Sequence, residues 1–391
     1  MCGILGYLHN RELNYSLEEF SQIVDKMSKR GPNSSGVIQF PFQENFLKLG
    51  HRRLAILDLE DTGNQPMVSH SKRFAIIYNG EIYNHRELRA NFFSEDMSLW
   101  KGSSDTETIL EIVEKEGLYK VLPKLEGMFA FCLIDKKENL IHLVRDRVGE
   151  KPLYISTGKG FFGFCSDLNP LKALPRFKRN LDQYAVGKFL QLNYIPSPLT
   201  IFKGSFKLLP GTCITVDLKK FIPREFKSFD EFISEPSVTI KEWWSIKDLY
   251  LTKRNTTDMS EQEVLHKTEN LLLNSVSRQM ISDVPLGAFL SGGVDSSVIV
   301  AMMVEASGGR GESVNTFSMG FTDGSYNELP YAREVATRFN TTHREGLVET
   351  KVVDLFDQLV VHFDEPFADV SLFPTHLVSQ LAREHVTVAL S

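Results

Sequence analysis

The sequence contains no run of about 18 apolar residues, the length at which a stretch becomes a candidate membrane-spanning helix. Its N-terminus has no basic segment followed by an apolar stretch, so no signal peptide is predicted. The chain has 4 cysteines and no Cys-x-x-Cys pair, which argues against a disulfide scaffold or a zinc site. A basic excess is also missing, since 44 basic and 50 acidic residues leave a net charge of −6. We therefore expect a protein of the reducing cytoplasm with neither a nucleic-acid nor a membrane partner.

The first half is rich in short β-like runs. At 391 residues the chain exceeds one average domain, so two domains are expected. The β-like runs of the first half include Gly3–Tyr7, Phe74–Tyr78, Met128–Ile134 and Ile141–Val144. Asn-Gly and Gly-Pro pairs break them, and apolar spacing predicts a helix over Asp105–Gly117. The pattern favours an α+β fold in which sheets face one another or a layer of helices.

The second half alternates strands and helices. The predicted elements are strands at Leu286–Leu290, Asn315–Phe321 and Val386–Leu390, and helices at Ser296–Glu305, Asn327–Phe339 and Ser371–His385. This alternation predicts an α/β domain with a parallel sheet and ligands at the carboxyl ends of its strands. We place a first domain at residues 1–210, a connector at 211–258 and a second domain at 259–391. Because the last strand is followed by Ser391 alone, we expect the second domain to be incomplete at its C-terminus.

Cys2 is a candidate nucleophile. After removal of Met1 it would carry both a thiol and a free α-amine, with ordinary pKa values of about 8.5 and 7.7–8.0. The amine could then accept the thiol proton near neutral pH, as a histidine does in a protease. A cysteine at position 2 by itself is weak support, because it could be incidental. The other cysteines, Cys132, Cys165 and Cys213, lie in apolar runs and are expected in the core.

A series of motifs follows Cys2 in order. They are Arg30–Gly36, His51–Asp58, Gln65–Met67, Asn79–Asn84, Ser104–Glu107 and Arg145–Tyr154. With this set, residues 1 to about 200 resemble the class II glutamine amidotransferases, which implies the αββα sandwich of the N-terminal nucleophile hydrolases. One position departs from the family pattern, because Asn33 stands where an Asp is usual after Arg-Gly-Pro. We expect this change to be structural rather than catalytic.

The resemblance implies roles for individual residues. Cys2 would attack the side-chain amide of glutamine, and the Asn79 side chain with the Gly80 N–H would form the oxyanion hole. Arg53 would bind the α-carboxylate, and Glu81 and Asp105 would hold the α-ammonium. The set of glutamine-binding residues is Arg53, Leu54, Ala55, Ile56, Leu57, Asn79, Gly80, Glu81 and Asp105. Four of these residues have a simpler reading: Asn79-Gly80 as a hairpin turn, Asp105 as a helix N-cap and Arg53 as a solvated charge.

The run Ser291-Gly-Gly-Val-Asp-Ser-Ser297 follows a predicted strand and opens a helix. Glycines there allow consecutive N–H groups to face one anion, and the helix dipole and serine hydroxyls add to the attraction. It lacks the Gly-Lys-[Ser/Thr] of a Walker loop and resembles the pyrophosphate loop of the ATP pyrophosphatases. This loop favours transfer of AMP with release of pyrophosphate. Acidic Asp364, Glu365 and Asp369 are either surface residues or the entrance to that site.

Together the two halves resemble the glutamine-hydrolysing asparagine synthetases. The resemblance implies ATP and Mg²⁺ as cofactors, with Leu290 and Met319 against the nucleotide. The pyrophosphate and metal would be held by Ser291, Gly292, Gly293, Asp295 and Ser296, with Asp295 as the metal ligand. Ser391 matches the first residue of a further nucleotide- and metal-binding loop. Substrates would be glutamine, ATP and an acceptor carboxylate; a homodimer is compatible with the resemblance.

Three functions stay open on sequence grounds. The first is asparagine synthesis from aspartate, glutamine and ATP, giving AMP, diphosphate and glutamate. The second is the same chemistry on a uronic-acid carboxylate in surface polysaccharide synthesis. The third is a glutaminase-only or regulatory protein, if the chain ends at Ser391. Phosphoribosyl and hexosamine amidotransferases lack the Ser-Gly-Gly loop, and β-lactam synthetases lack Cys2, so we exclude both.

Overall fold

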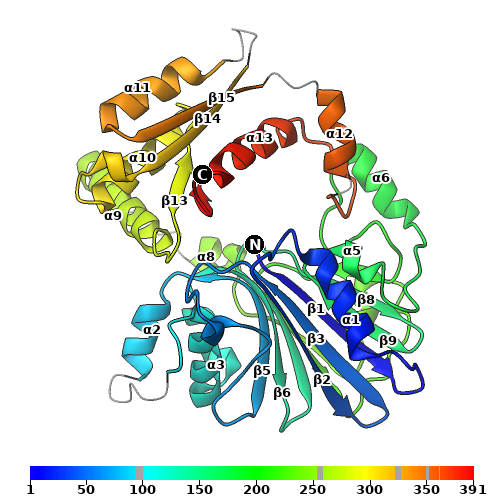
Figure 1. Cartoon of the computed structure of the whole chain (residues 1–391). Helices are drawn as coiled ribbons and strands as arrows, with labels where there is room; N and C mark the ends of the chain where they lie inside the picture. Colours follow the sequence, from blue (N-terminus) through cyan, green and yellow to red (C-terminus); the bar gives the residue numbers. More distant parts are fainter. Residues whose placement is uncertain (94–99, 253–258, 322–326, 349–351, 361) are drawn as a thin grey trace. The chain divides into compact units, whose positions relative to one another are not determined.

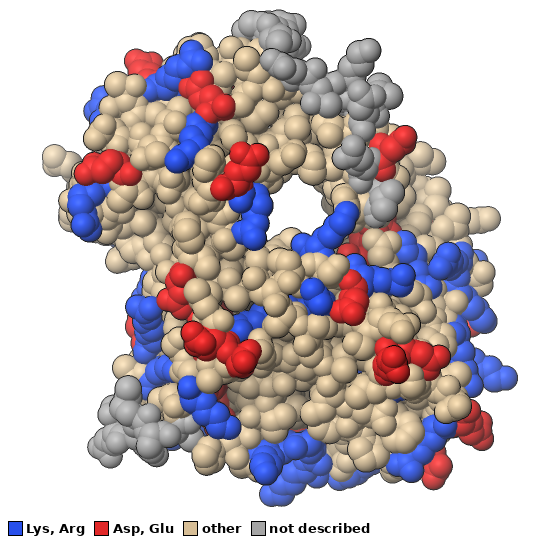
Figure 2. Space-filling view, viewed as in Figure 1, with Lys and Arg blue, Asp and Glu red and all other residues tan. Residues whose placement is uncertain are grey.

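The computed structural model describes residues 1–93, 100–252, 259–321, 327–348, 352–360 and 362–391. The chain folds into two compact units. The first comprises residues 1–253 with the short segment 363–368, and the second comprises 254–362 with 369–391. None of the described helices is long and apolar enough to cross a membrane. Charged side chains of both signs are interspersed over the visible face of the molecule (Figure 2).

The described residues of the first unit form two antiparallel six-stranded sheets. The first sheet has the order β10 (Ser205–Lys207), β8 (Tyr154–Gly158), β9 (Phe161–Cys165), β1 (Gly3–Asn10), β3 (Asn45–Arg53) and β2 (Ser34–Phe42). The second has the order β12 (Val238–Glu242), β11 (Thr212–Asp217), β7 (Leu140–Arg145), β6 (Gly127–Asp135), β5 (Phe74–Ile82) and β4 (Met67–Val68). Their inner faces share one apolar core, in which Ile4, Leu49 and Phe164 of the first sheet join Ile77 and Leu143 of the second.

Helices cover the outer face of each sheet (Figure 1). Those on the first sheet are α1 (Leu17–Val24), α5 (Leu168–Leu171) and α6 (Gln183–Leu192). Those on the second are α2 (His85–Phe92), α3 (Asp105–Glu116) and α4 (Leu118–Val121). Two further short helices are α7 (Phe229–Ile233) and α8 (Ile246–Thr252). The expected αββα sandwich is therefore confirmed: each sheet is apolar on both faces because one faces its partner and the other faces helices.

The second unit contains a parallel sheet of the order β15-β14-β13-β16. Its described elements are α9 (Glu261–Gln279), β13 (Leu286–Phe289), α10 (Val294–Ala306), β14 (Asn315–Phe321), α11 (Leu329–Phe339), β15 (Thr342–Val348), α12 (Val352–Val360), α13 (Leu372–Arg383) and β16 (Val388–Leu390). Apolar side chains of α9, α10 and α11 pack on one side of β13, and α13 packs against Phe317 of β14. Helices on both faces of a parallel sheet confirm the predicted α/β class.

The structure differs from the predicted connector at residues 211–258. Strands β11 and β12 add to the second sheet, and α7 between them buries Phe229 and Phe232 in the inter-sheet core. Residues 211–252 are therefore part of the first unit, because they extend its sheet and fill its core. The last part of the predicted connector, residues 253–258, lies outside the described residues. Sequence reasoning also missed α9 and β15.

Candidate active site

Cys2 lies at the start of β1, beside the end of β3. The register of the two strands pairs Gly3 with Arg52, so the chain leaving β3 passes the Cys2 side chain. The Leu54 N–H donates to the Cys2 Sγ at 3.3 Å, and the Sγ lies 3.7 Å from the Leu54 carbonyl oxygen. Burial raises the pKa of the Cys2 thiol, and the Leu54 N–H partly offsets this effect. A resting thiol held in this way needs a base before it can act as a nucleophile.

The N-terminal amine is an available base. Burial lowers its pKa to about 6, and it interacts electrostatically with Cys2, Arg30, Lys151 and Glu81. In the present chain this amine belongs to Met1. An amine with a pKa below 7 is mostly neutral at physiological pH, so it can accept a proton. Arg30 donates from Nε to the Cys2 carbonyl oxygen at 3.2 Å and holds the backbone of the nucleophile in place.

Asn79 and Gly80 lie inside strand β5, which excludes the alternative reading of a hairpin turn. The Asn79 side chain is 1% exposed, and neither atom of its amide has a hydrogen-bond partner among the described residues. A buried amide without a partner costs stability, so its retention suggests a ligand. At Gly80, a Cβ would lie 2.2 Å from the Met128 carbonyl oxygen, so no other residue fits. Both features agree with the predicted oxyanion hole.

Two buried carboxylates lie beside this strand. Asp105 Oδ2 accepts from the Tyr78 hydroxyl at 2.7 Å and from the Ile82 N–H at 2.9 Å. The N-cap of α3 is Ser104, so the alternative role of Asp105 as the cap is wrong. Glu81 is 8% exposed, and its Oε1 has no hydrogen-bond partner among the described residues. Burial, followed by the negative charge of Asp105, raises the pKa of Glu81 to about 7, while Lys151 and the N-terminal amine oppose the shift.

The pKa of Glu81 leads to a testable pH dependence. Above about pH 7 the carboxylate is charged and can bind an ammonium; below that pH it is neutral and cannot. We therefore expect the KM for glutamine to rise as the pH falls through about 7. At high pH, Glu81→Gln should raise KM roughly 10- to 100-fold, since a hydrogen bond to a charged group is lost. Initial rates of glutamate formation measured across this range test the prediction: a KM that follows the same pH curve in both proteins would contradict it.

Arg53 is buried rather than solvated, with 5% of its surface exposed. Its Nη1 donates to the Glu60 carbonyl oxygen at 2.8 Å and to Asn64 Oδ1 at 3.1 Å. Its Nη2 donates to the carbonyl oxygens of Leu57, at 3.1 Å, and of Asp58. The four Nη protons therefore already have partners in the loop that follows β3. To bind a carboxylate through Nη, Arg53 must exchange one of these carbonyls for the stronger acceptor.

The other predicted residues of this loop lie close to the nucleophile. Residues 54–57 are half-buried, and Leu54 contacts Cys2 as described above. The Ala55 N–H donates to Asn33 Oδ1 at 3.0 Å. The aspartate that is usual at position 33 could accept the same hydrogen bond. The contact with the Ala55 N–H is therefore kept when asparagine stands there. The structure therefore agrees with a structural role for position 33.

Sequence reasoning missed some of the residues that position the site. Gln65 Oε1 accepts the Tyr78 N–H at 2.6 Å, and its Nε2 donates to the Thr106 hydroxyl at 3.2 Å. It thereby links β5 to the first turn of α3. His51 Nε2 lies 3.0 Å from the Tyr78 carbonyl oxygen, and burial lowers the pKa of His51 to about 3, so the ring is neutral. Both residues lie in quoted motifs, but their partners are distant in sequence.

The Ser291 loop connects β13 to α10. Gly292 adopts a left-handed φ of 84°, and a Cβ there would lie 2.6 Å from the backbone nitrogen of Ala332. The Gly293 N–H donates to Ser291 Oγ at 3.2 Å, and the Ser291 and Ser296 hydroxyls are 3.0 Å apart. Gly293 caps α10 without a side-chain hydrogen bond, so the N-terminus of this 13-residue helix is available to an anion.

The predicted nucleotide contacts meet at the carboxyl edge of the parallel sheet. β13 pairs with both β14 and β16, and the registers Phe289↔Phe317 and Ala288↔Leu390 bring the three strand ends together. Leu290 is buried, and its N–H donates to the Phe317 carbonyl oxygen at 2.8 Å. Met319 on β14 and Ser391 after β16 lie at the same edge. This is where an open α/β sheet binds its ligands.

The residues of this edge fit ATP and a magnesium ion. The Gly292 turn and the α10 N-terminus suit a pyrophosphate group. The described residues contain no cluster of three His, Cys, Asp or Glu that could hold a metal by themselves. Magnesium commonly takes one or two carboxylates, with phosphate oxygens and water completing its shell. The exposed Asp295 in the first turn of α10 can supply such a ligand.

Two of the acidic residues after α12, Asp364 and Glu365, have hydrogen-bond partners that neither reading of the sequence included. Asp364 Oδ2 accepts the Leu168 N–H at 2.9 Å, and Glu365 accepts the Ile201 N–H at 2.7 Å. Glu365 also pairs with Lys207 at 2.6 Å. These partners belong to the first unit, which includes the segment. Asp369 is exposed and accepts the Ser371 N–H at 2.8 Å.

Comparisons with known proteins match one protein family to each half of the chain. The glutamine amidotransferase domain family matches residues 1–227, and the asparagine synthase family matches residues 267–391. The protein named "putative asparagine synthetase (glutamine-hydrolyzing) 2" from Methanocaldococcus jannaschii is 36% identical over 100% of this chain and 73% of its own length. The chain belongs to the glutamine-hydrolysing asparagine synthetase family. Relatives within this family include asparagine synthetases 1 and 3 of Bacillus subtilis, each 30% identical over 100% and 95% of this chain, respectively.

The chain spans only part of its asparagine synthetase relatives. It covers 57% of the first Bacillus subtilis protein and 58% of the other. Family membership nevertheless extends over both units, because one family match lies in each. The two family matches follow one another along the chain, with the glutamine amidotransferase domain first and the asparagine synthase family second.

Proposed function

We propose that the protein is an ATP-dependent, glutamine-hydrolysing ligase that forms L-asparagine from L-aspartate. In this proposal ATP, aspartate, glutamine and water give AMP, diphosphate, asparagine and glutamate. The observation that carries it is the combination of two sites in one chain. One unit holds the half-buried Cys2 thiol, two buried carboxylates and the Asn79 amide, which has no hydrogen-bond partner among the described residues, and the other unit holds a glycine-built anion loop.

The first site supports glutamine hydrolysis through Cys2. Removal of Met1 would give Cys2 its own α-amine as the base for the thiol. The thiolate would attack the glutamine Cδ, with the oxyanion stabilised by the Asn79 amide and the Gly80 N–H. The amine then returns the proton to the leaving ammonia, and water hydrolyses the glutamyl thioester. Glu81 and Asp105 would bind the α-ammonium, while the α-carboxylate replaces a loop carbonyl on Arg53.

The second site supports activation of a carboxylate. An oxygen of the acceptor would attack the α-phosphorus of ATP, releasing pyrophosphate and giving an acyl-adenylate. The N–H groups of the Gly292 turn and the hydroxyls of Ser291 and Ser296 would hold the pyrophosphate. Bound magnesium would neutralise charge on the phosphates, with Asp295 as its protein ligand. Ammonia then attacks the acyl carbon and AMP leaves.

The nucleotide products test this proposal. With glutamine, aspartate and Mg²⁺, we expect one AMP and one pyrophosphate for each asparagine, because the loop lacks the lysine of a γ-phosphoryl transferase. Chromatography of the nucleotides measures this ratio. Formation of ADP and phosphate would overturn the adenylation step. Omission of aspartate should abolish AMP release.

A uronic acid is the second candidate acceptor. Replacing aspartate by a panel of carboxylates that includes uronic acids distinguishes the two. Pyrophosphate release only with a uronic acid would favour polysaccharide modification, and glutamate release without pyrophosphate under any condition would favour a glutaminase or regulatory role. Aspartate is our choice because the similar proteins carry the name asparagine synthetase.

Three related assignments accompany the proposal. We assign glutamine hydrolysis to the unit of residues 1–253 and adenylation to the second unit. We place the protein in a reducing cytoplasm, since Cys2 must stay a thiol and all 4 cysteines are free. A homodimer stays a prediction, which light scattering can test.

A further inference from the structure

Asp58 occupies a strained position in the loop around Arg53. Its φ is 56°, a left-handed value that a residue other than glycine rarely adopts. This conformation points its carbonyl oxygen at Arg53 Nη2, and the residue is only 5% exposed. A Cβ at Gly63, further along the loop, would lie 2.0 Å from Arg53 Nη2. The loop therefore encloses the guanidinium closely, and the conformation of Asp58 sets part of that enclosure.

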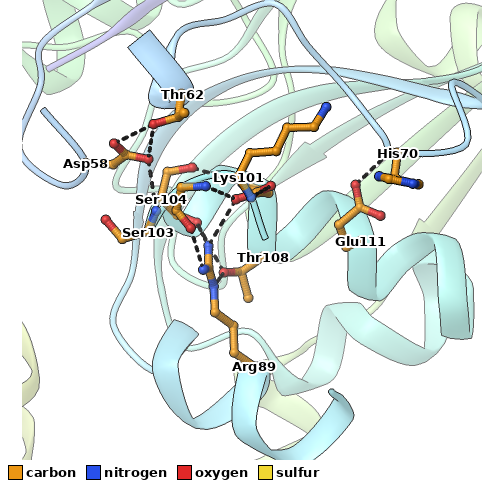
Figure 3. Close-up of polar contacts among 11 residues, drawn as sticks. Asp58, Thr62, His70, Arg89, Lys101, Ser103, Ser104, Thr108 and Glu111 are labelled. Carbon is orange, nitrogen blue, oxygen red and sulfur yellow. Dashed lines mark hydrogen bonds and ion pairs between the residues drawn. The ribbon is translucent and has the colours of Figure 1, made fainter. Parts of the chain in front are cut away.

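The Asp58 side chain stabilises the conformation through two contacts (Figure 3). The Thr62 hydroxyl lies 2.9 and 3.0 Å from its two carboxylate oxygens. The Ser103 N–H donates to Oδ2 at 3.0 Å. A Cβ at Gly102 would lie 2.1 Å from the same oxygen, so the two loops can approach only because residue 102 is glycine. Asp58 thus joins the Arg53 loop to the chain segment that enters α3.

That second segment is itself firmly held. Arg89 donates to the carbonyl oxygens of Gly102, at 2.8 Å, and Ser104, at 2.6 Å, and its guanidinium lies 4.0 Å above the Trp100 ring. The carboxylate of Glu107 accepts the N–H groups of Lys101 at 2.9 Å and Gly102 at 3.1 Å. Ser104 then caps α3, and Asp105 is the first residue of that helix. The segment is a rigid platform that ends at a carboxylate of the candidate site.

We propose that Asp58 is a positioning residue that fixes the spacing between Arg53 and Asp105, and so makes the site selective for an unmodified α-amino acid. The proposal rests on the proposed glutaminase function. The α-carboxylate and α-ammonium of glutamine are attached to one carbon, so their two receptors must keep one separation. Asp58 is hydrogen-bonded to Arg53 through its carbonyl oxygen and to the Ser103 N–H through its carboxylate, and Ser103 lies two residues before Asp105. Holding ligand groups to within about 0.5 Å requires this kind of support.

The test compares Asp58→Ala with the wild-type chain. We expect kcat/KM for glutamine hydrolysis to fall roughly 10- to 100-fold, mainly through KM, because binding rather than the chemical step is lost. The rate at which iodoacetamide alkylates Cys2 should change less than about twofold, since this reagent has neither an α-carboxylate nor an α-ammonium. The preference for glutamine over glutaramate, which lacks the α-ammonium, should fall with the same variant.

Two further variants separate positioning from folding. Asp58→Asn keeps an oxygen for the Ser103 N–H but loses the negative charge, so its KM should rise less than in Asp58→Ala, by about two- to fivefold. Asp182→Ala removes a carboxylate that caps α6 through Tyr184 and Ala185 and should leave KM unchanged. If Asp58→Ala does not fold, Asp58→Asn decides the matter: its KM should rise about two- to fivefold, and an unchanged KM and preference would overturn the proposal.

Other results also count against the inference. A loss of kcat and of Cys2 alkylation with an unchanged KM would show that Asp58 supports the nucleophile instead. A wild-type chain that does not hydrolyse glutamine would refute the proposed function itself. A wild-type chain that hydrolyses glutamine, with an Asp58→Ala variant of unchanged KM and preference, would refute the positioning role alone.

Discussion

The Cys2→Ala variant is expected to release glutamate from glutamine about 10⁴-fold more slowly than the wild type, or not measurably. The loss should be this large because, in the proposed mechanism, the thiol forms the covalent bond to the Cδ of glutamine. Burial raises the pKa of the Cys2 thiol, so the proposed reaction also depends on a base, the α-amine that Cys2 gains when Met1 is removed. Glutamate formation, followed by a coupled dehydrogenase assay, measures the effect.

A second cysteine provides the matched control. Cys213 is also free, but it is fully buried in the core between the second sheet and its helices. Cys213→Ala should change the rate less than about threefold, apart from a small loss of stability. Free ammonia supplied in place of glutamine should restore formation of the amide product in Cys2→Ala, because the variant loses only the release of ammonia from glutamine. Persistent glutamate formation in Cys2→Ala would contradict the assignment of the nucleophile.

The Asn79→Ala variant is expected to lose about 10²- to 10³-fold in kcat for glutamine hydrolysis, with little change in KM. The Asn79 amide is buried without a partner in the described part of the chain, so its donor is free for the oxyanion of the tetrahedral intermediate. That charge develops in the transition state and not in bound glutamine. The interaction should therefore contribute to kcat rather than to substrate binding.

Asn84 offers a contrasting control five residues along the chain. Its side chain is also buried, but its amide nitrogen donates to the Lys124 carbonyl oxygen at 2.9 Å and its amide oxygen accepts the Glu126 N–H at 3.1 Å. Asn84→Ala should lower the thermal stability, since it leaves both backbone groups without this partner, and should leave kcat within a few-fold. A kcat for Asn79→Ala within about tenfold of the wild type would remove Asn79 from the oxyanion hole.

The fold was predictable where local patterns agree with tertiary structure. Short apolar runs became β1, β5, β6 and β7, and strand–helix alternation gave the parallel sheet of the second unit. The prediction of a connector was wrong at residues 211–252 for a physical reason. The stretch between residues 217 and 236 is charged and has no clear period, but the phenylalanines in it are buried, with Phe226 and Phe232 at 0% exposure. Widely spaced aromatic residues in a charged segment give no periodic pattern, although each buries a large area.

The residues of the candidate site could be predicted from the sequence, but the contacts that hold them in place could not. Cys2, Asn79 and Asp105 were found because each belongs to a motif of adjacent residues. The contact from Asp58 to Ser103 joins positions 45 residues apart, and that from Asp364 to Leu168 joins positions 196 apart. Such pairs leave no trace in local sequence, because they depend on how loops meet after the sheets have formed. The enclosure of Arg53 by backbone carbonyls is hidden for the same reason.

The central claim is that Cys2 forms a covalent intermediate with glutamine, and the mass of the quenched protein tests it most directly. The wild-type chain is mixed with glutamine, quenched in acid within the first turnover, digested and analysed by mass spectrometry. We predict one γ-glutamyl group on the peptide that begins at Cys2 and none on peptides with the buried Cys132, Cys165 or Cys213. Glutamate release without any glutamyl group on Cys2, or with the group on another cysteine, would contradict the account.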